Sequence, residues 1–193
     1  MEQKQVIVVT DGDAAALKTI QYVANKIGGL CIAQSAGNPT HLTGQELIEL
    51  ILQADKNPVF VMFDDCGSRY EGLGEHAMRI VYDEPMIQVI GAIAVASATH
   101  SKEWAKVDIS IDRFGHLTEY GVDKNGFPDL EIGRINGDTL YILDEFEIPV
   151  VVGIGDIGKM GGFDDVKKGA PITMQAVQII LERSGNLDKK KRL

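Results

Sequence analysis

The segment that most constrains the fold is Val6-Ile-Val-Val-Thr-Asp-Gly-Asp13, near the N-terminus. It opens with four β-branched apolar residues in succession, and the absence of polar alternation predicts a strand buried on both faces. Strands of this kind belong to parallel sheets that helices cover on both sides. Residues 14–27 then change to helical spacing, with Leu17, Ile20 and Ala24 on one face. The segment therefore predicts a parallel α/β core.

The same alternation of buried strand and helix continues along the chain. Further apolar strands are expected at residues 30–33, 59–63, 86–95 and 148–154. Thr43-Gly-Gln-Glu46 has the pattern of a capping box, which predicts that a second helix begins there. This alternation is typical of a three-layer α/β/α fold with a mostly parallel, doubly wound sheet, whose right-handed crossovers bring the carboxyl ends of the strands to one edge.

The pattern changes between residues 104 and 137. Val107-Asp-Ile-Ser-Ile-Asp112 alternates with period two, as a half-exposed strand does, and Asn125-Gly126 is a typical hairpin turn. We expect an inserted, hairpin-like segment of one or two strands at the edge of the sheet. A helix is expected after it, from Asp138 to Glu147, although the β-branched and aromatic residues of this stretch leave the element type open.

Length and composition limit the classes of protein to consider. The chain has 193 residues with a net charge of -9, and we expect a single α/β domain over residues 1–187, followed by a basic, disordered tail over 188–193. The negative charge argues against nucleic acid as a partner. No apolar run approaches the length of about 18 residues that a membrane-spanning helix needs, and the N-terminus lacks the pattern of a signal peptide. A cytoplasmic location is expected.

Acidic residues stand at the predicted ends of three strands. Carboxylates brought together in this way repel one another unless a cation lies between them, so such clusters often hold Ca²⁺ or Mg²⁺. The alternative is that each one caps the helix that follows, because Asp is a favoured N-cap residue. The candidate metal ligands are Asp11, Asp13, Asp64, Asp65 and Asp156.

A glycine-rich loop follows the last predicted strand. The stretch from Gly153 to Gly158 matches the letters of a dinucleotide-binding fingerprint, but no helix opens directly after it, and Met160 stands where a P-loop requires Ser or Thr. Nucleotide binding is therefore disfavoured, although backbone N–H groups of such a turn can hold a small anion. Candidate ligand-binding residues in and around this loop and at the other strand ends are Gly153, Gly155, Gly158, Lys159, Ser97, Thr99 and Arg69.

Three stretches together resemble one protein family. These stretches are residues 6–13, residues 63–75 (Phe-Asp-Asp-Cys-Gly-Ser-Arg-Tyr-Glu-Gly-Leu-Gly-Glu), and residues 155–162 with the helix start at Gly169-Ala-Pro-Ile-Thr173 and Leu181-Glu-Arg-Ser-Gly185. They are similar to the soluble stage V sporulation protein AE family of spore-forming bacteria, and the likeness spans nearly the whole chain.

The resemblance implies a non-enzymatic accessory role in moving dipicolinic acid, with calcium, into the developing spore and out at germination. It implies membrane proteins of the same system as partners, a peripheral position at the inner spore membrane, and dipicolinate as a possible small anionic ligand. It supplies no catalytic residues. An alternative is a divalent-metal phosphotransferase or nuclease, since the layout of acids is similar to that of Toprim-type domains, although Asp11-Gly-Asp13 stands after the wrong strand. The oligomeric state stays open, with a homo-oligomer as one possibility.

Overall fold

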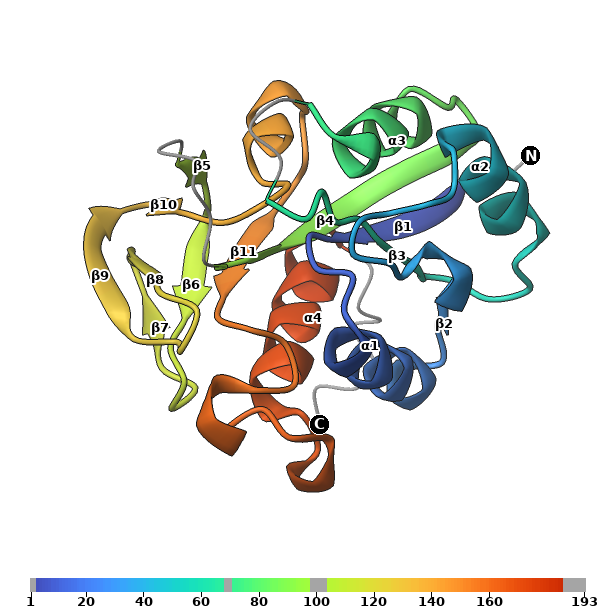
Figure 1. Cartoon of the computed structure of the whole chain (residues 1–193). Helices are drawn as coiled ribbons and strands as arrows, with labels where there is room; N and C mark the ends of the chain where they lie inside the picture. The colour runs from blue at the N-terminus through green and yellow to red at the C-terminus, as the bar shows by residue number, and fades with distance from the viewer. Residues whose placement is uncertain (1–2, 68–70, 98–103, 186–193) are drawn as a thin grey trace.

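The computed structural model describes residues 3–67, 71–97 and 104–185. Over these residues a seven-stranded sheet runs through the molecule in the order β2-β3-β1-β4-β11-β6-β7 (Figure 1). Strand β7 pairs antiparallel with β6, and the other pairings described in this sheet are parallel. The strands are β1 (Lys4–Val9), β2 (Leu30–Cys31), β3 (Val59–Met62), β4 (Ile87–Val95), β6 (Ile109–Ile111), β7 (Leu117–Thr118) and β11 (Val151–Ile154). The mostly parallel sheet predicted from the sequence is confirmed.

The central position of β1 explains its apolar sequence. Val6 pairs with Val59 of β3 on one side and with Val89 of β4 on the other, and Val6, Ile7 and Val9 are fully buried. A strand with neighbours on both edges and helices on both faces has no solvent-exposed side, so polar alternation is absent from it.

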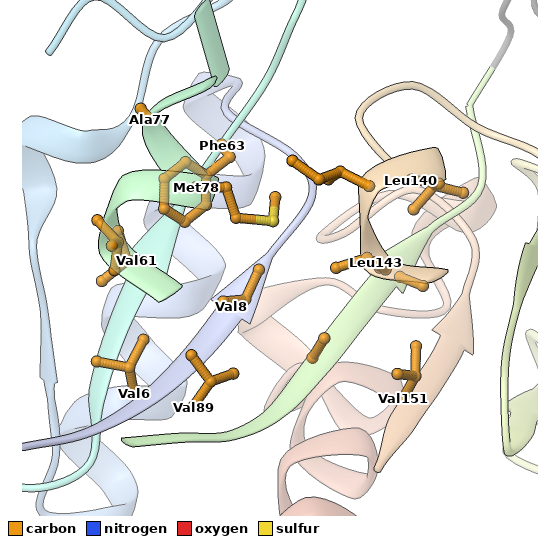
Figure 2. Close-up of a cluster of buried hydrophobic side chains, with 14 of the residues drawn as sticks. Val6, Val8, Val61, Phe63, Ala77, Met78, Val89, Leu140, Leu143 and Val151 are labelled. Carbon is orange, nitrogen blue, oxygen red and sulfur yellow. The ribbon is translucent and has the colours of Figure 1, made fainter. Parts of the chain in front are cut away.

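Helices cover both faces of the sheet, as Figure 1 shows. One face packs against α1 (Ala14–Ile27) and α4 (Pro171–Arg183), and the other against α2 (Gly44–Gln53), α3 (Leu73–Tyr82) and the 3₁₀ helix η2 (Tyr141–Glu145). Figure 2 shows the second face, where Phe63 lies beside Met78 of α3 and Leu143 of η2 lies over the sheet. The doubly wound, three-layer arrangement is therefore confirmed.

The ends of two helices follow from local sequence. Asp13 is the N-cap of α1, and Gly28, at φ 81°, ends that helix in the left-handed region, where glycine avoids the steric cost of a Cβ. The capping box predicted for α2 is present: the N–H of Glu46 donates to the Thr43 hydroxyl, and the N–H of Thr43 donates to the Glu46 carboxylate.

The inserted segment is more elaborate than the one or two strands predicted. In the described part of residues 104–137 there are six short strands: β5 (Ala105–Lys106), β6, β7, β8 (Tyr120–Val122), β9 (Pro128–Ile132) and β10 (Arg134–Ile135). Strands β6 and β7 extend the edge of the main sheet, whereas β8 pairs with β9 and β10 with β5 in two small antiparallel sheets. Five of these six strands have only two or three residues, which is too short to show a hydrophobic period.

Two further predictions need correction. The helix expected over residues 138–147 is only the five-residue η2, because Thr139 adopts φ 59° and breaks the helical backbone just before it. The strand expected over 30–33 ends at Cys31, and a 3₁₀ helix, η1 (Ala33–Ser35), follows. Two more 3₁₀ turns, η3 (Met160–Gly162) and η4 (Val166–Lys168), lie between β11 and α4. The predicted basic tail lies outside the described residues.

Candidate functional site

A pocket of about 370 Å³ lies where β1, β3, β4 and β11 end, at the carboxyl edge of the sheet. In parallel α/β sheets this edge is the usual place for a ligand. We call this space the acidic pocket, because five of its lining residues are aspartates. It is lined by Thr10, Asp11, Asp13, Asn38, Asp64, Cys66, Gly67, Val95, Ser97, Asp138, Asp156 and Lys159.

Asp11, two residues after the end of β1, is a buried carboxylate of the pocket, with 9% of its surface exposed. Its Oδ1 atom accepts a hydrogen bond from the N–H of Asp13 at 3.2 Å, whereas its buried Oδ2 atom has no hydrogen-bond partner among the described residues. Burial, with repulsion from Asp13, raises the pKa of Asp11 to about 7. A buried polar atom without a hydrogen-bond partner carries a desolvation cost in the folded protein.

Asp13 serves as a helix cap and as part of an ion pair. Its Oδ1 atom accepts hydrogen bonds from the N–H groups of Ala15 and Ala16, each at 2.8 Å, and its Oδ2 atom lies 2.5 Å from Nζ of Lys159. Burial disfavours the charged form of Asp13, but these hydrogen bonds outweigh burial and hold its pKa below the ordinary value. Asp13 therefore presents a full negative charge to the pocket.

The acidic pair after β3 divides between two roles. Asp64 lines the pocket, and its two carboxylate oxygens accept hydrogen bonds from the N–H groups of Cys66 at 2.7 Å and Gly12 at 3.2 Å. Asp65 does not line it, because its Oδ1 atom accepts a hydrogen bond from the N–H of Gly74 at 2.6 Å, in the first turn of α3. Burial raises the pKa of both carboxyls. Asp65 is thus tied to the start of a helix, as the capping alternative expected.

Two more acids complete the pocket, and sequence reasoning identified only one of them. Asp156, after β11, places its Oδ2 atom 3.6 Å from Nζ of Lys159, and burial raises its pKa. Asp138 comes from the turn before η2, where its side chain accepts hydrogen bonds from the N–H groups of Gly67 and Thr139. Asp138 follows no strand of the sheet, so the strand-end pattern could not find it.

The predicted ligand-binding residues are only partly brought together. Ser97 and Lys159 line the pocket, and the Ser97 hydroxyl accepts a hydrogen bond from the N–H of Asp138 at 2.7 Å. Gly153 lies within β11, and neither it nor the other two glycines of the loop lines the pocket. The loop continues into η3, and no α-helix starts before Pro171, so it lacks the geometry of a dinucleotide site. The remaining two candidates, Thr99 and Arg69, lie outside the described residues.

Carboxylates dominate the charge of this edge of the sheet. The pocket gathers five carboxylates and one ammonium group, and at least one carboxylate oxygen lacks a partner in the described structure. In the described ranges, no three His, Cys, Asp or Glu side chains are already arranged to enclose a metal ion. Any cation held here in this conformation would use few direct protein ligands and complete its shell with water, as Mg²⁺ in particular commonly does.

Comparison with known proteins now identifies the family. The sequence model of the SpoVAE family, described as stage V sporulation protein AE1, matches residues 5–184. The chain belongs to the stage V sporulation protein AE family. The match covers nearly all of the chain and includes every residue of the acidic pocket. A search of curated proteins and a search of solved structures gave no significant match.

Membership of the SpoVAE family implies a role in sporulation and suggests an association with the proteins of the SpoVA operon. The resemblance predicted from the sequence is therefore confirmed at the level of the family. None of the described helices combines the length and apolar character needed to span a membrane.

Proposed function

We propose that this SpoVAE-family protein is a non-enzymatic accessory protein of spore formation and germination that binds a divalent cation in the acidic pocket. The observation that carries the proposal is the buried Oδ2 atom of Asp11: the residue lines the pocket, and this atom has no hydrogen-bond partner among the described residues. Carboxylate oxygens are the protein ligands that Ca²⁺ and Mg²⁺ prefer. A bound cation would satisfy this atom and reduce the repulsion between Asp11, Asp13 and Asp156, which contributes to the raised pKa of Asp11.

The charge of the pocket supports a cation over a free anion. Lys159, its only cationic lining residue within the described structure, is already paired with Asp13 and Asp156. A dianion such as dipicolinate would meet five carboxylates there, so we propose that it enters only as a chelate with its metal. The volume of about 370 Å³ leaves room for an ion with several waters, since one water occupies about 30 Å³ in the liquid.

Two further parts of the proposal rest on the family alone. We propose membrane proteins of the same sporulation system as partners, and a peripheral position at the inner spore membrane. Family membership supports a setting in sporulation, and the partner surface is independent of the pocket argument.

Calorimetric titration tests the cation site. The purified protein is titrated with Ca²⁺, with Mg²⁺ and with calcium dipicolinate, beside an Asp11→Asn variant and a matched Asp55→Asn control that makes the same charge change at an exposed residue remote from the pocket. We expect a dissociation constant between about micromolar and millimolar, the range of calcium sensors and weak calcium modules. The Asp11→Asn variant should bind at least about tenfold more weakly, and the control should bind like the wild type.

Two results would overturn this proposal. Absence of binding by the wild-type protein up to about 10 mM cation would leave the pocket acids as helix caps and loop anchors. Hydrolysis of a phosphodiester or phosphomonoester with Mg²⁺ or Mn²⁺, lost on Asp64→Asn substitution, would favour the enzymatic alternative. Thermal unfolding of each variant establishes that a loss of binding does not reflect a loss of fold.

A further inference from the structure

Lys159 places its ammonium group between two carboxylates of the acidic pocket. Its Nζ atom lies 2.5 Å from Oδ2 of Asp13 and 3.6 Å from Oδ2 of Asp156. These two acids follow different strands, β1 and β11, which lie on either side of β4, so the ammonium group bridges two separate parts of the pocket wall. The ion pairs keep the pKa of Lys159 above its ordinary value although burial lowers it, so the ammonium group stays charged.

The backbone around Lys159 is held by contacts that do not involve its side chain. Nη2 of Arg113 donates to the carbonyl oxygen of Met160 at 2.8 Å, and the N–H of Gly162 donates to the carbonyl oxygen of Lys159 at 2.9 Å. On the other side, the buried carboxylate of Asp164 accepts a hydrogen bond from the N–H of Gly158 at 3.0 Å. The loop from 158 to 164 is thus anchored independently of the ion pair.

The Lys159 side chain is free to leave while its backbone stays in place. It is 44% exposed and has a flexible four-carbon stem, so rotation of the stem into solvent breaks only the two ion pairs. Exposed and half-exposed ion pairs contribute little to stability, because solvent screens them. A divalent cation near Asp13 and Asp156 carries twice the charge of the ammonium group and can bring more oxygen ligands together.

We propose that Lys159 is a built-in competitor for the cation pocket: its ammonium group holds Asp13 and Asp156 in the free protein, and a divalent cation binds by displacing it. This inference rests on the proposed function and adds its regulation. Before the ion binds, the Lys159 ammonium group offsets the repulsion between Asp13 and Asp156. Because the ion must displace this group, its affinity for the pocket is lowered, and the ion can be released again.

The test compares calcium affinity in Lys159→Gln, Lys159→Met and wild-type protein by calorimetry. Lys167→Gln is the matched control, since it makes the same charge change at a lysine of the following turn that does not line the pocket. We expect Lys159→Gln and Lys159→Met to bind Ca²⁺ about threefold to tenfold more tightly than wild type, and Lys167→Gln to bind like wild type. Titration at about 0.5 M NaCl separates displacement of the Lys159 ammonium group from the long-range effect of removing a positive charge, because salt screens charges more than a few ångströms apart.

The results distinguish failure of the inference from failure of the proposed function. Wild-type binding with unchanged or weaker affinity in both Lys159 variants overturns the inference and leaves the cation site standing. Absence of binding by all variants overturns both. Tighter binding that disappears in an Asp13→Asn/Lys159→Gln double variant supports displacement at Asp13, and tighter binding that survives in the double variant overturns it.

Discussion

Lys159 and Asp13 form an ion pair across 146 residues of sequence, with Nζ and Oδ2 2.5 Å apart. The contact joins the loop after β11 to the N-cap of α1, which follows β1. Strands β1 and β11 lie on either side of β4, in the middle of the sheet. A doubly wound sheet produces this proximity, because parallel strands end at the same edge whatever their separation along the chain. Charge at one strand end is therefore balanced by a residue from another.

The raised pKa of Asp11 predicts a stability that depends on pH. Its folded-state pKa is about 7, against 3.8 for an aspartate carboxyl in water, so between these values the folded state binds a proton that the unfolded state releases. In the protein without a bound cation, this group's contribution is fully present below about pH 4 and is lost as pH rises to about 7, by roughly 4 kcal/mol at most. We expect Asp11→Asn to raise the free energy of unfolding by about 2–4 kcal/mol at pH 8 and to change it little at pH 4.

Urea unfolding at the two pH values, in the presence of a chelator, measures this difference. Asp55→Asn is the control, since the exposed Asp55 makes no described contact with the pocket. A destabilised Asp11→Asn protein at pH 8 would contradict the prediction and would indicate that the ionised Asp11 carboxylate is satisfied in the folded state.

Asp65 tests the boundary between helix caps and cation ligands. Because its carboxylate accepts hydrogen bonds from the N–H groups of Gly74 and Glu75, Asp65→Ala should lower the free energy of unfolding by about 1–3 kcal/mol. Because Asp65 does not line the pocket, calcium affinity of the folded variant should stay within about twofold of wild type. Thermal unfolding and calorimetry on the same sample measure both, and a large loss of affinity would place Asp65 among the ligands.

The sequence was sufficient to predict the sheet and its acidic edge, because apolar runs and strand-end acids recur together along the chain. Val6 to Val9 and Val59 to Met62 are continuous apolar runs, and each is followed by acids at a strand end. What the sequence could not decide is which side chain faces the pocket. Successive residues of an extended chain point to opposite sides, so Asp64 lines the pocket and its neighbour Asp65 turns toward α3.

Other features were beyond the sequence for different reasons. Asp138 reaches the pocket from the turn before η2, where tertiary packing alone brings it beside the strand ends. In residues 107–112 the alternation predicted a half-exposed strand, yet Ser110 of β6 is fully buried because the inserted segment covers the edge of the sheet. The alternation of polar and apolar residues predicts which face of a strand is exposed only when the elements that cover that strand are known.

Gly12, in the middle of the Asp11-Gly-Asp13 turn, allows two loops to approach closely. A Cβ atom at this position would meet the carbonyl oxygen of Gly37 and would lie 2.9 Å from Cβ of Asp64. We therefore expect Gly12→Ala to lower the free energy of unfolding by about 1–3 kcal/mol, as overpacking does. It should also weaken calcium binding by displacing Asp64. Urea unfolding measures the change in stability, and calorimetry measures the change in calcium affinity. Wild-type values for both would contradict the prediction and would mean that the loop at Gly37 moves away from the added Cβ without loss of stability.

Arg113 holds the loop that carries Lys159. Its guanidinium carbon lies 4.5 Å from the ring centroids of both Phe127 and Phe163, and its Nη2 atom donates to the carbonyl oxygen of Met160 at 2.8 Å. A planar guanidinium can stack on aromatic rings and donate a hydrogen bond from its edge at the same time, which a lysine ammonium cannot do. Arg113→Lys keeps the charge and removes this geometry, so we expect it to cost about 1 kcal/mol of stability.

Hydrogen exchange measured by mass spectrometry locates that loss. Peptides over residues 155–164 should exchange about fivefold faster in Arg113→Lys than in wild type, because a local opening that becomes about 1 kcal/mol easier raises the open population by that factor. Arg134→Lys, at an exposed arginine, is the control and should leave the loop unchanged. Equal protection of the loop in Arg113→Lys and wild type would contradict this prediction. It would mean that the Asp164 contacts are sufficient to hold the backbone at Lys159 without Arg113.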